Sequence, residues 1–102
     1  MKKKLRILLT GSCGNISKKC IIPSLNEYEI VGFDLAIGDN VLDIKSIKNK
    51  MVAIDIVIHT AGIAGPTKGK SYEDFFEINY IGTKNLIDLA YENNVSKFIF
   101  FS

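Results

Sequence analysis

The sequence predicts an α/β fold in which helices cover both faces of a doubly wound parallel sheet. Short runs rich in Ile, Val and Phe alternate with segments of helical periodicity, and the first run ends in a turn that contains glycine. Near-continuous apolar runs are typical of parallel strands buried on both faces, and strand–helix alternation favours right-handed crossovers. The 102 residues, 47% hydrophobic and 24% charged, suit one globular domain. We therefore expect residues 1–102 to form a single domain.

The strands are predicted from four apolar runs. Each run is short, and its Ile, Val and Phe content favours a strand over a helix. These runs cover Leu5–Thr10, Glu29–Phe33, Ile54–Thr60 and Lys97–Ser102.

The segments between the runs predict three helices. Asn15–Leu25 follows the glycine turn, and Pro23 should kink or end this helix. Ile44–Met51 is a shorter and weaker candidate. The strongest candidate is Ser71–Asn93, in which Ser71 can cap the first turn and two acidic residues follow where the helix dipole favours them.

The net charge and the cysteine spacing indicate which partners and which cellular compartment to expect. The formal net charge is +2, and three lysines at positions 2–4 form a small basic end that is typically solvated, so we expect no nucleic-acid partner. No apolar run approaches the roughly 18 residues of a membrane span, and Arg6 interrupts the first run, which argues against a secretion signal. Cys13 and Cys20 match no metal or redox spacing, so we expect a reduced, cytoplasmic chain without a metal site.

The turn after the first strand contains the first candidate binding residues. Gly11 permits a tight turn, and Gly14 lets a pyrophosphate approach the backbone. Asn15 and Ile16 begin the following helix, whose free N–H groups and positive dipole end favour phosphate. Two glycines after a strand are common, so the turn alone is a weak signal.

Asp34 strengthens the prediction. It ends the second strand about 20 residues past the turn, where a carboxylate accepts hydrogen bonds from ribose hydroxyls. Strand, glycine turn, helix, strand and acid therefore occur in the order of a Rossmann-type dinucleotide site. No Lys or Arg follows Asp34 before Lys45, which favours NAD over NADP. A nucleotide-hydrolase phosphate loop is excluded because the turn lacks a Gly-Lys-Ser/Thr ending.

These motifs resemble the extended short-chain dehydrogenase/reductase family, the NAD-dependent epimerases and dehydratases that act on nucleotide sugars. The family turn Thr-Gly-x-x-Gly-x-x-Gly is matched at Thr10, Gly11 and Gly14, while Ser17 replaces the third glycine. Asp34 matches the ribose-binding acid. The resemblance covers nearly the whole chain and implies a Rossmann fold that is truncated after the family's fifth strand.

Further motifs carry implied roles. The pair Asp43-Ile44 resembles the family residues beside the adenine ring, and Thr60, Ala61 and Gly62 resemble the small residues that line the cofactor channel. The stretch Asn79-Tyr80-Ile81-Gly82-Thr83-Lys84-Asn85-Leu86 resembles a family helix in which the residue at Asn79 lies near the nicotinamide.

Each of these residues also has an ordinary structural explanation. Asp43 alone is more often a solvated turn residue, and Asn79 on a helix is normally a surface residue. The lone histidine, His59, is more often structural than catalytic, and Gly82 is typical of close packing. The order and spacing of the motifs, taken together, support the family.

No catalytic residue is predicted within the chain. The resemblance places the acid/base pair Tyr-x-x-x-Lys after the last strand, and the Tyr80–Lys84 pair has that spacing on a different helix. The resemblance also implies that the substrate domain is absent. We therefore expect an NAD-binding portion that would meet a nucleotide sugar only with a catalytic half, or, alternatively, a non-catalytic Rossmann binding or regulatory module. A structural remnant without NAD is the third reading.

The last strand predicts self-association. Its Phe and Ile residues would form a partly uncovered hydrophobic edge, and such edges pair with other chains. The Ser71–Asn93 helix resembles the family's dimer-forming helix and is the second candidate surface.

Overall fold

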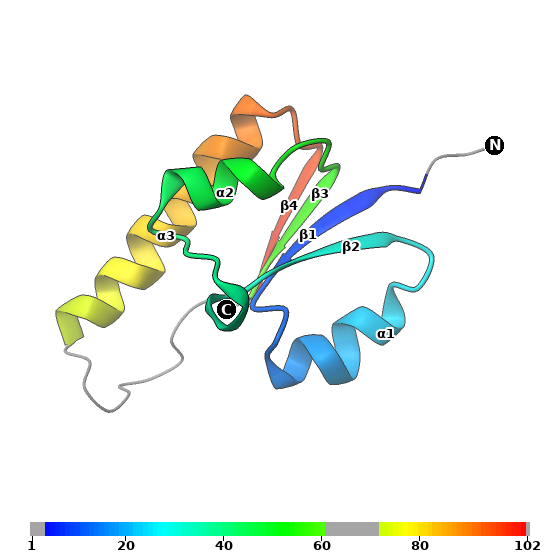
Figure 1. Cartoon of the computed structure of the whole chain (residues 1–102), viewed down its shortest axis with the longest axis horizontal. Coiled ribbons are helices and arrows are strands. Elements are labelled where there is room, and N and C mark those ends of the chain that lie inside the picture. Colours follow the sequence, from blue (N-terminus) through cyan, green and yellow to red (C-terminus); the bar gives the residue numbers. More distant parts are fainter. Residues whose placement is uncertain (1–3, 61–71, 102) are drawn as a thin grey trace.

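The computed structural model describes residues 4–60 and 72–101 of the chain. The elements alternate along the chain as strands and helices (Figure 1). Their order is β1 (Arg6–Thr10), the π-helical turn η1 (Ser17–Ile21), α1 (Ile22–Ser24), β2 (Glu29–Phe33), the 3-10 turn η2 (Leu35–Ile37), α2 (Ile44–Lys50), β3 (Ile56–His59), α3 (Tyr72–Glu92) and β4 (Lys97–Phe100).

The four strands form one parallel sheet in the order β2-β1-β3-β4. Leu8 of β1 pairs with Val31 of β2 on one side and with Val57 of β3 on the other. The chain therefore winds outward from β1 to β2 and then crosses back to β3. Ligands of such sheets bind where the winding reverses, at the carboxyl ends of the strands. In this sheet, that point lies between β1 and β3.

Helices cover both faces of the sheet, as the fold class predicted. Figure 1 shows α1 on one face and α2 with α3 on the other. Successive side chains of β1 point to opposite faces: Leu8 belongs to the cluster under α2 and α3, whereas Ile7 and Leu9 belong to the cluster with Ile21. The two-sided burial explains the near-continuous apolar strands.

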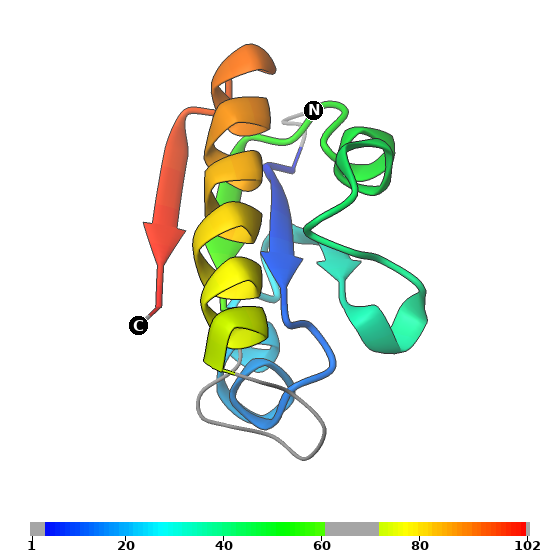
Figure 2. The same ribbon diagram turned by 90° about the vertical axis from the view of Figure 1, so that its left-hand side faces the viewer.

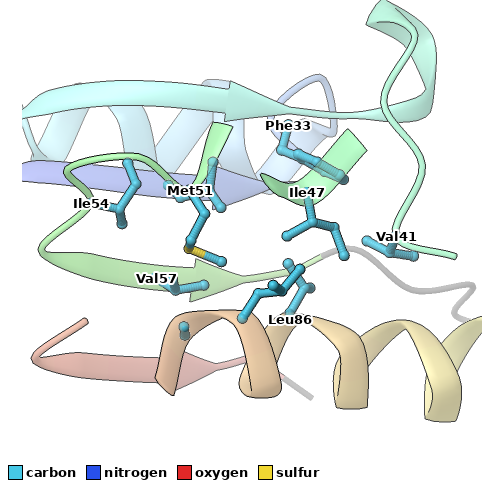
Figure 3. Close-up of a cluster of buried hydrophobic side chains, with 10 residues drawn as sticks. Phe33, Val41, Ile47, Met51, Ile54, Val57 and Leu86 are labelled. Carbon is cyan, nitrogen blue, oxygen red and sulfur yellow. The ribbon is translucent and has the colours of Figure 1, made fainter. Parts of the chain in front are cut away.

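The larger cluster joins the sheet to α2 and α3. Figure 3 shows its side chains converging between the strands and these two helices. Ile47 of α2, Met51 and Leu86 of α3 are fully buried in it. Replacing a buried side chain of this size with Ala typically costs about 2–5 kcal/mol. The buried members are Leu8, Phe33, Val41, Ile47, Met51, Ile54, Val57, Leu86, Leu89 and Ala90.

The first helix differs from a regular α-helix. It begins at Asn15, widens into the π-helical turn Ser17–Ile21 and ends with α1 at Ser24. Pro23 has no N–H to donate, and its ring crowds the carbonyl four residues earlier, so a regular helix cannot pass it unchanged. The helix ends one residue after Pro23, as its position predicted.

The last strand lies at an edge of the sheet beside α3 (Figure 2). Its predicted hydrophobic exposure is confirmed, since Ile99, Phe100 and Phe101 are 38%, 57% and 45% exposed. The predicted strand extended to Ser102, and that residue lies outside the described ones. It is the fourth strand of the described sheet, although the family resemblance numbered it as the fifth. Residues 39–43, between β2 and α2, form turns and extended backbone instead of a strand.

Gly82 packs α3 closely against the segment before α2. A Cβ at Gly82 would lie only 2.6 Å from Cγ2 of Val41. The Asn85 amide donates a hydrogen bond to the Val41 carbonyl at 3.0 Å. Two residues of the helix motif therefore fix the loop that leads into α2, which confirms the close-packing explanation of Gly82.

We predict that Gly82→Ala destabilises the protein by about 1–3 kcal/mol, because the clash with Val41 outweighs the gain in helix propensity. Val41→Ala on its own also costs stability through the cavity that it leaves. In the double variant the two losses should not add, because Val41→Ala removes Cγ2, the closer of the two Val41 atoms that crowd the new Cβ. Urea unfolding of the four proteins measures this coupling, and strictly additive losses would contradict the packing account.

Candidate functional site

The glycine turn has the backbone geometry that its glycines predicted. Gly11 has φ +66°, in the left-handed region that favours glycine. The N–H of Gly14 donates to the Gly11 carbonyl at 3.0 Å, and a Cβ at Gly14 would lie 3.2 Å from that oxygen. A side chain at either position would strain or crowd the turn. Asn15 and Ile16 are exposed at the start of the helix that follows.

Asp34 connects the end of β2 to this turn. One carboxylate oxygen accepts the N–H of Cys13, at 2.9 Å, and the other accepts the N–H of Ala36, also at 2.9 Å. The carboxylate therefore holds the glycine turn and caps η2 at the same time. An ionised carboxylate offers about four acceptor positions. Asp34 is only half-buried, so its carboxylate is partly accessible to solvent.

A second carboxylate, which the sequence analysis did not single out, supports Asp34. Asp39 accepts the backbone N–H of Asp34 at 3.1 Å and the ammonium group of Lys50 at 2.7 Å. The same ammonium donates to the Gly32 carbonyl at 2.8 Å. Asp39 is buried and Lys50 half-buried. No motif spacing indicates this cluster, because it forms only when α2 packs beside the end of β2.

Ser17 occupies the position of the missing third glycine. The residue is 1% exposed, and its hydroxyl has no hydrogen-bond partner among the described residues. An unpaired buried hydroxyl typically costs about 1–3 kcal/mol. Ser17 also begins the π-helical turn. The substitution is thus accommodated against the sheet, at a cost in stability.

The ends of β1 and β3 are tied together beside the turn. Thr60 donates its backbone N–H to the Thr10 hydroxyl at 2.9 Å and its own hydroxyl proton to the Thr10 carbonyl at 2.6 Å. Thr60 therefore lies at the point where the winding of the sheet reverses.

His59 extends this contact to α3. Its Nδ1 lies 2.6 Å from the Thr10 hydroxyl and its Nε2 lies 2.9 Å from the Thr83 hydroxyl. The ring also stacks on Phe100, with centroids 5.2 Å apart, and meets Phe98 edge-on. His59 is 1% exposed, which agrees with the expectation of a structural histidine.

The partners of His59 fix its tautomer. The Thr83 hydroxyl donates its only proton to the Asn79 backbone carbonyl at 2.6 Å, so it must accept from His59 Nε2–H. Burial lowers the pKa of His59 from 6.5 to about 4. The ring is therefore neutral at pH 7, and its bare Nδ1 accepts from the Thr10 hydroxyl.

Asn79 lies beside a groove between α3 and β4. The groove has a volume of about 590 Å³, and the rings of Phe76 and Tyr80 stack in it with centroids 5.5 Å apart. Asn79 and Thr83 form part of its wall. The lining residues are Phe76, Asn79, Tyr80, Thr83, Lys84, Ile87 and Phe100.

The remaining predicted site residues are Asp43, Ile44, Ala61 and Gly62. Asp43 caps α2 by accepting the N–H of Lys45 at 3.0 Å, and both Asp43 and Ile44 are exposed. Taken alone, Asp43 was expected to be a solvated turn residue, and the structure shows an exposed aspartate that caps a helix. Ala61 and Gly62 fall outside the described residues, so their predicted place along the cofactor channel stays a prediction.

The described residues contain no cluster of three or more His, Cys, Asp or Glu side chains that could hold a metal ion. Within residues 4–60 and 72–101, no helix is both long and apolar enough to cross a bilayer. Cys13 and Cys20 are free thiols.

A dinucleotide fits the geometry of the carboxyl edge. The turn has no side chain at Gly11 and Gly14, and the half-buried carboxylate of Asp34 lies beside it, bonded to the N–H of Cys13. These features define the class of protein: a Rossmann-type unit of the short-chain dehydrogenases and reductases.

More narrowly, the chain belongs to the 3-beta hydroxysteroid dehydrogenase/isomerase family, whose model matches residues 16–102. This confirms the resemblance found in the sequence. The match begins at residue 16, after the glycine turn. The description of that turn therefore depends on its backbone geometry and not on the family match.

Three proteins illustrate what this chain is similar to. L-arabinose 1-dehydrogenase (NAD(P)(+)) from Haloferax volcanii is 26% identical over 95% of this chain. A solved structure of a short-chain dehydrogenase/reductase superfamily protein from Agrobacterium tumefaciens with bound NAD superposes with a TM-score of 0.80, at 23% identity over 93% of this chain. The structure of UDP-N-acetylglucosamine 4-epimerase from Bacillus cereus superposes with a TM-score of 0.76, at 27% identity over 95% of this chain.

This chain spans only part of the length of these proteins. It covers 40% of the arabinose dehydrogenase, 31% of the Agrobacterium protein and 35% of the epimerase. The similarity therefore concerns the part of each protein that corresponds to the described sheet and helices.

We predict that the protein loses stability as the pH falls from about 6.5 to about 4. The unfolded chain binds a proton at His59 in this window, whereas the folded chain does not until the pH nears 4. A shift of this size corresponds to about 3 kcal/mol, complete near pH 4 and constant below it. Unfolding free energies measured at several pH values test the prediction.

His59→Gln is the control, because carboxylates that titrate in the same window are unchanged in it. His59 is the only histidine of the chain. The variant should show a shallower decline than the wild type, and an identical decline would contradict the assignment.

Proposed function

We propose that this chain is the NAD-binding portion of an epimerase/dehydratase-type oxidoreductase. The observation that carries the proposal is the pair of contacts made by Asp34, whose half-buried carboxylate binds the N–H of Cys13 in the glycine turn and that of Ala36. The phosphate-binding and ribose-binding elements are thereby joined in one rigid unit before any ligand arrives. Such preorganisation lowers the entropy cost of binding.

Each candidate residue receives a role in this proposal. The N–H groups at Asn15 and Ile16 and the glycine backbone face the pyrophosphate, while Asp34 accepts the hydroxyls of the adenosine ribose. The remaining roles follow the family resemblance. Asp43 and Ile44 flank the adenine, Thr60, Ala61 and Gly62 line the cofactor channel, and Asn79 lies near the nicotinamide.

The charges near Asp34 favour NAD over NADP. The Asp34 carboxylate would repel a 2′-phosphate on the ribose that it binds. Lys50 brings a positive charge to the end of β2, but its ammonium is already bound by Asp39 at 2.7 Å and by the Gly32 carbonyl. The cation is therefore neutralised before a phosphate could recruit it.

A nucleotide sugar is the proposed substrate class of the whole enzyme. The likeness to UDP-N-acetylglucosamine 4-epimerase supports this class, and the bound nicotinamide would supply hydride transfer. Among the described residues, Tyr80 and Lys84 have the spacing of the family's acid/base pair, but Lys84 forms an ion pair with Asp88 at 3.0 Å. We assign these residues no proton transfer, and the described part of the chain then binds and orients the cofactor.

Self-association is a further part of the proposal. Apolar side chains are exposed along the edge strand β4 and just after it, at Ile99, Phe100 and Phe101, and Phe100 also lines the groove between α3 and β4. Exposed edges of this kind pair with other chains.

A cytoplasmic location remains a prediction from the cysteine spacing.

We predict concentration-dependent oligomers in analytical ultracentrifugation, because pairing would bury the exposed edge. Phe100→Lys should reduce the association, whereas Tyr91→Lys, at an exposed position outside the groove lining, should change it less. A single monomeric species over a wide concentration range would contradict the proposal.

The test of NAD binding is calorimetric titration of the purified chain with NAD and with NADP at pH 7. We predict that NAD binds more tightly than NADP and that Asp34→Ala weakens NAD binding about 10- to 100-fold, through loss of charged hydrogen bonds. Asp88→Ala, which removes an exposed carboxylate on α3, is the matched control and should leave the affinity unchanged.

Two outcomes would contradict the proposed function. The first is no NAD binding by a chain that circular dichroism shows to be folded. The second is equal NAD affinity in the wild type and Asp34→Ala.

A further inference from the structure

One buried polar group of the carboxyl edge, the ring of His59, lies outside the proposed cofactor contacts. His59 joins three elements: its own strand β3, Thr10 at the end of β1 and Thr83 on α3. Both ring nitrogens are engaged, and the ring is stacked on Phe100. A side chain so enclosed has no free nitrogen with which to accept a substrate proton, so its function must be exerted through its neighbours.

We propose that His59 is a positioning residue that fixes Asn79 and its helix α3 relative to the glycine turn, and so sets how the nicotinamide half of the dinucleotide is held. This inference rests on the proposed function and deepens it. It assigns a role to the His59–Thr83 contact. Thr83 belongs to the helix motif, but the sequence analysis gave neither residue of this contact a role in cofactor binding.

The path from the turn to Asn79 consists of short, directed hydrogen bonds. Thr10 precedes Gly11, whose left-handed backbone starts the turn. His59 receives the Thr10 hydroxyl proton at 2.6 Å and donates to the Thr83 hydroxyl at 2.9 Å. Thr83 passes its own proton to the Asn79 carbonyl at 2.6 Å. Every donor in this path is fixed by the next acceptor.

The ring suits this role because it is rigid and uncharged. A planar imidazole spans the two hydroxyls with a fixed separation, and the aromatic contacts with Phe98 and Phe100 restrict its rotation. The hydrogen-bonded and ring partners of His59 carry no charge, and Lys84 on the same helix as Thr83 is paired with Asp88. The path therefore keeps one arrangement of protons near neutral pH.

The inference predicts an unequal effect on the two halves of the cofactor. Loss of the contact with α3 should release the Asn79 side of the site and leave the turn and Asp34 in place. NAD and ADP-ribose share the adenosine and pyrophosphate and differ in the nicotinamide. Binding of NAD should weaken, while binding of ADP-ribose should persist.

The test uses Thr83→Val, which has nearly the shape of threonine but lacks the hydroxyl, and Thr83→Ser, which retains it. Calorimetry with NAD and with ADP-ribose measures both affinities for each full-length chain. We expect Thr83→Val to weaken NAD about 2- to 10-fold, the range for one hydrogen bond, and to change ADP-ribose less than about 2-fold. Thr83→Ser should restore the NAD affinity.

His59→Phe tests the ring itself, because it keeps the aromatic contacts and removes both hydrogen bonds. Its NAD affinity should fall at least as far as that of Thr83→Val. If this buried replacement does not fold, the variants Thr83→Val and Thr83→Ser still test the positioning role, because Thr83 is half-exposed on α3.

The possible results separate the two proposals. Equal weakening of NAD and ADP-ribose, or no change of either in Thr83→Val, would overturn the positioning role while NAD binding stands. Failure of Thr83→Ser to recover NAD affinity would overturn it as well. A folded wild type that binds neither ligand would overturn the proposed function and this inference with it.

Discussion

The hydrogen bond from the Cys13 N–H to the Asp34 carboxylate is the contact on which the proposed site depends. It closes a loop of residues that includes the whole first helix, and it joins the glycine turn to the end of β2, the two elements that the proposed site combines. The parallel register makes this possible, because Thr10 of β1 lies opposite Phe33 of β2 and both strands end at one edge. Asp34 then needs to reach only as far as the adjacent turn.

Other contacts stabilise the loops around the carboxyl edge of the sheet. Asp39 and Lys50 hold the backbone at Asp34, and Gly82 with Asn85 holds the loop before α2. Function is commonly placed on loops that a rigid scaffold positions. In this chain the sheet and α3 provide the scaffold, while short hydrogen bonds at the strand ends fix the loops to it.

The sequence predicted those parts of the protein that depend on order and spacing. Strand burial, the glycine turn and the place of Asp34 follow from local patterns, because parallel strands with helical crossovers always bring these residues to one edge. The bond between His59 and Thr83 and the Asp39–Lys50 pair were not predicted, since both depend on how a helix packs across the sheet. The π-helical turn was also missed, although Pro23 indicated a disturbance. The sequence showed only that Ser17 replaces the third glycine, and the structure adds that its hydroxyl is buried without a partner among the described residues.

The central claim is that Asp34 holds the glycine turn in the form that receives the dinucleotide. The backbone amide spectrum of the ¹⁵N-labelled protein, recorded for the wild type and for Asp34→Asn with and without NAD, tests it most directly. The account predicts that the Cys13 amide shifts in the variant before any ligand is added. It also predicts that NAD shifts the amides of residues 11–17 in the wild type much more than in Asp34→Asn. A Cys13 amide unchanged by the substitution, or equal NAD-induced shifts in both proteins, would contradict the claim.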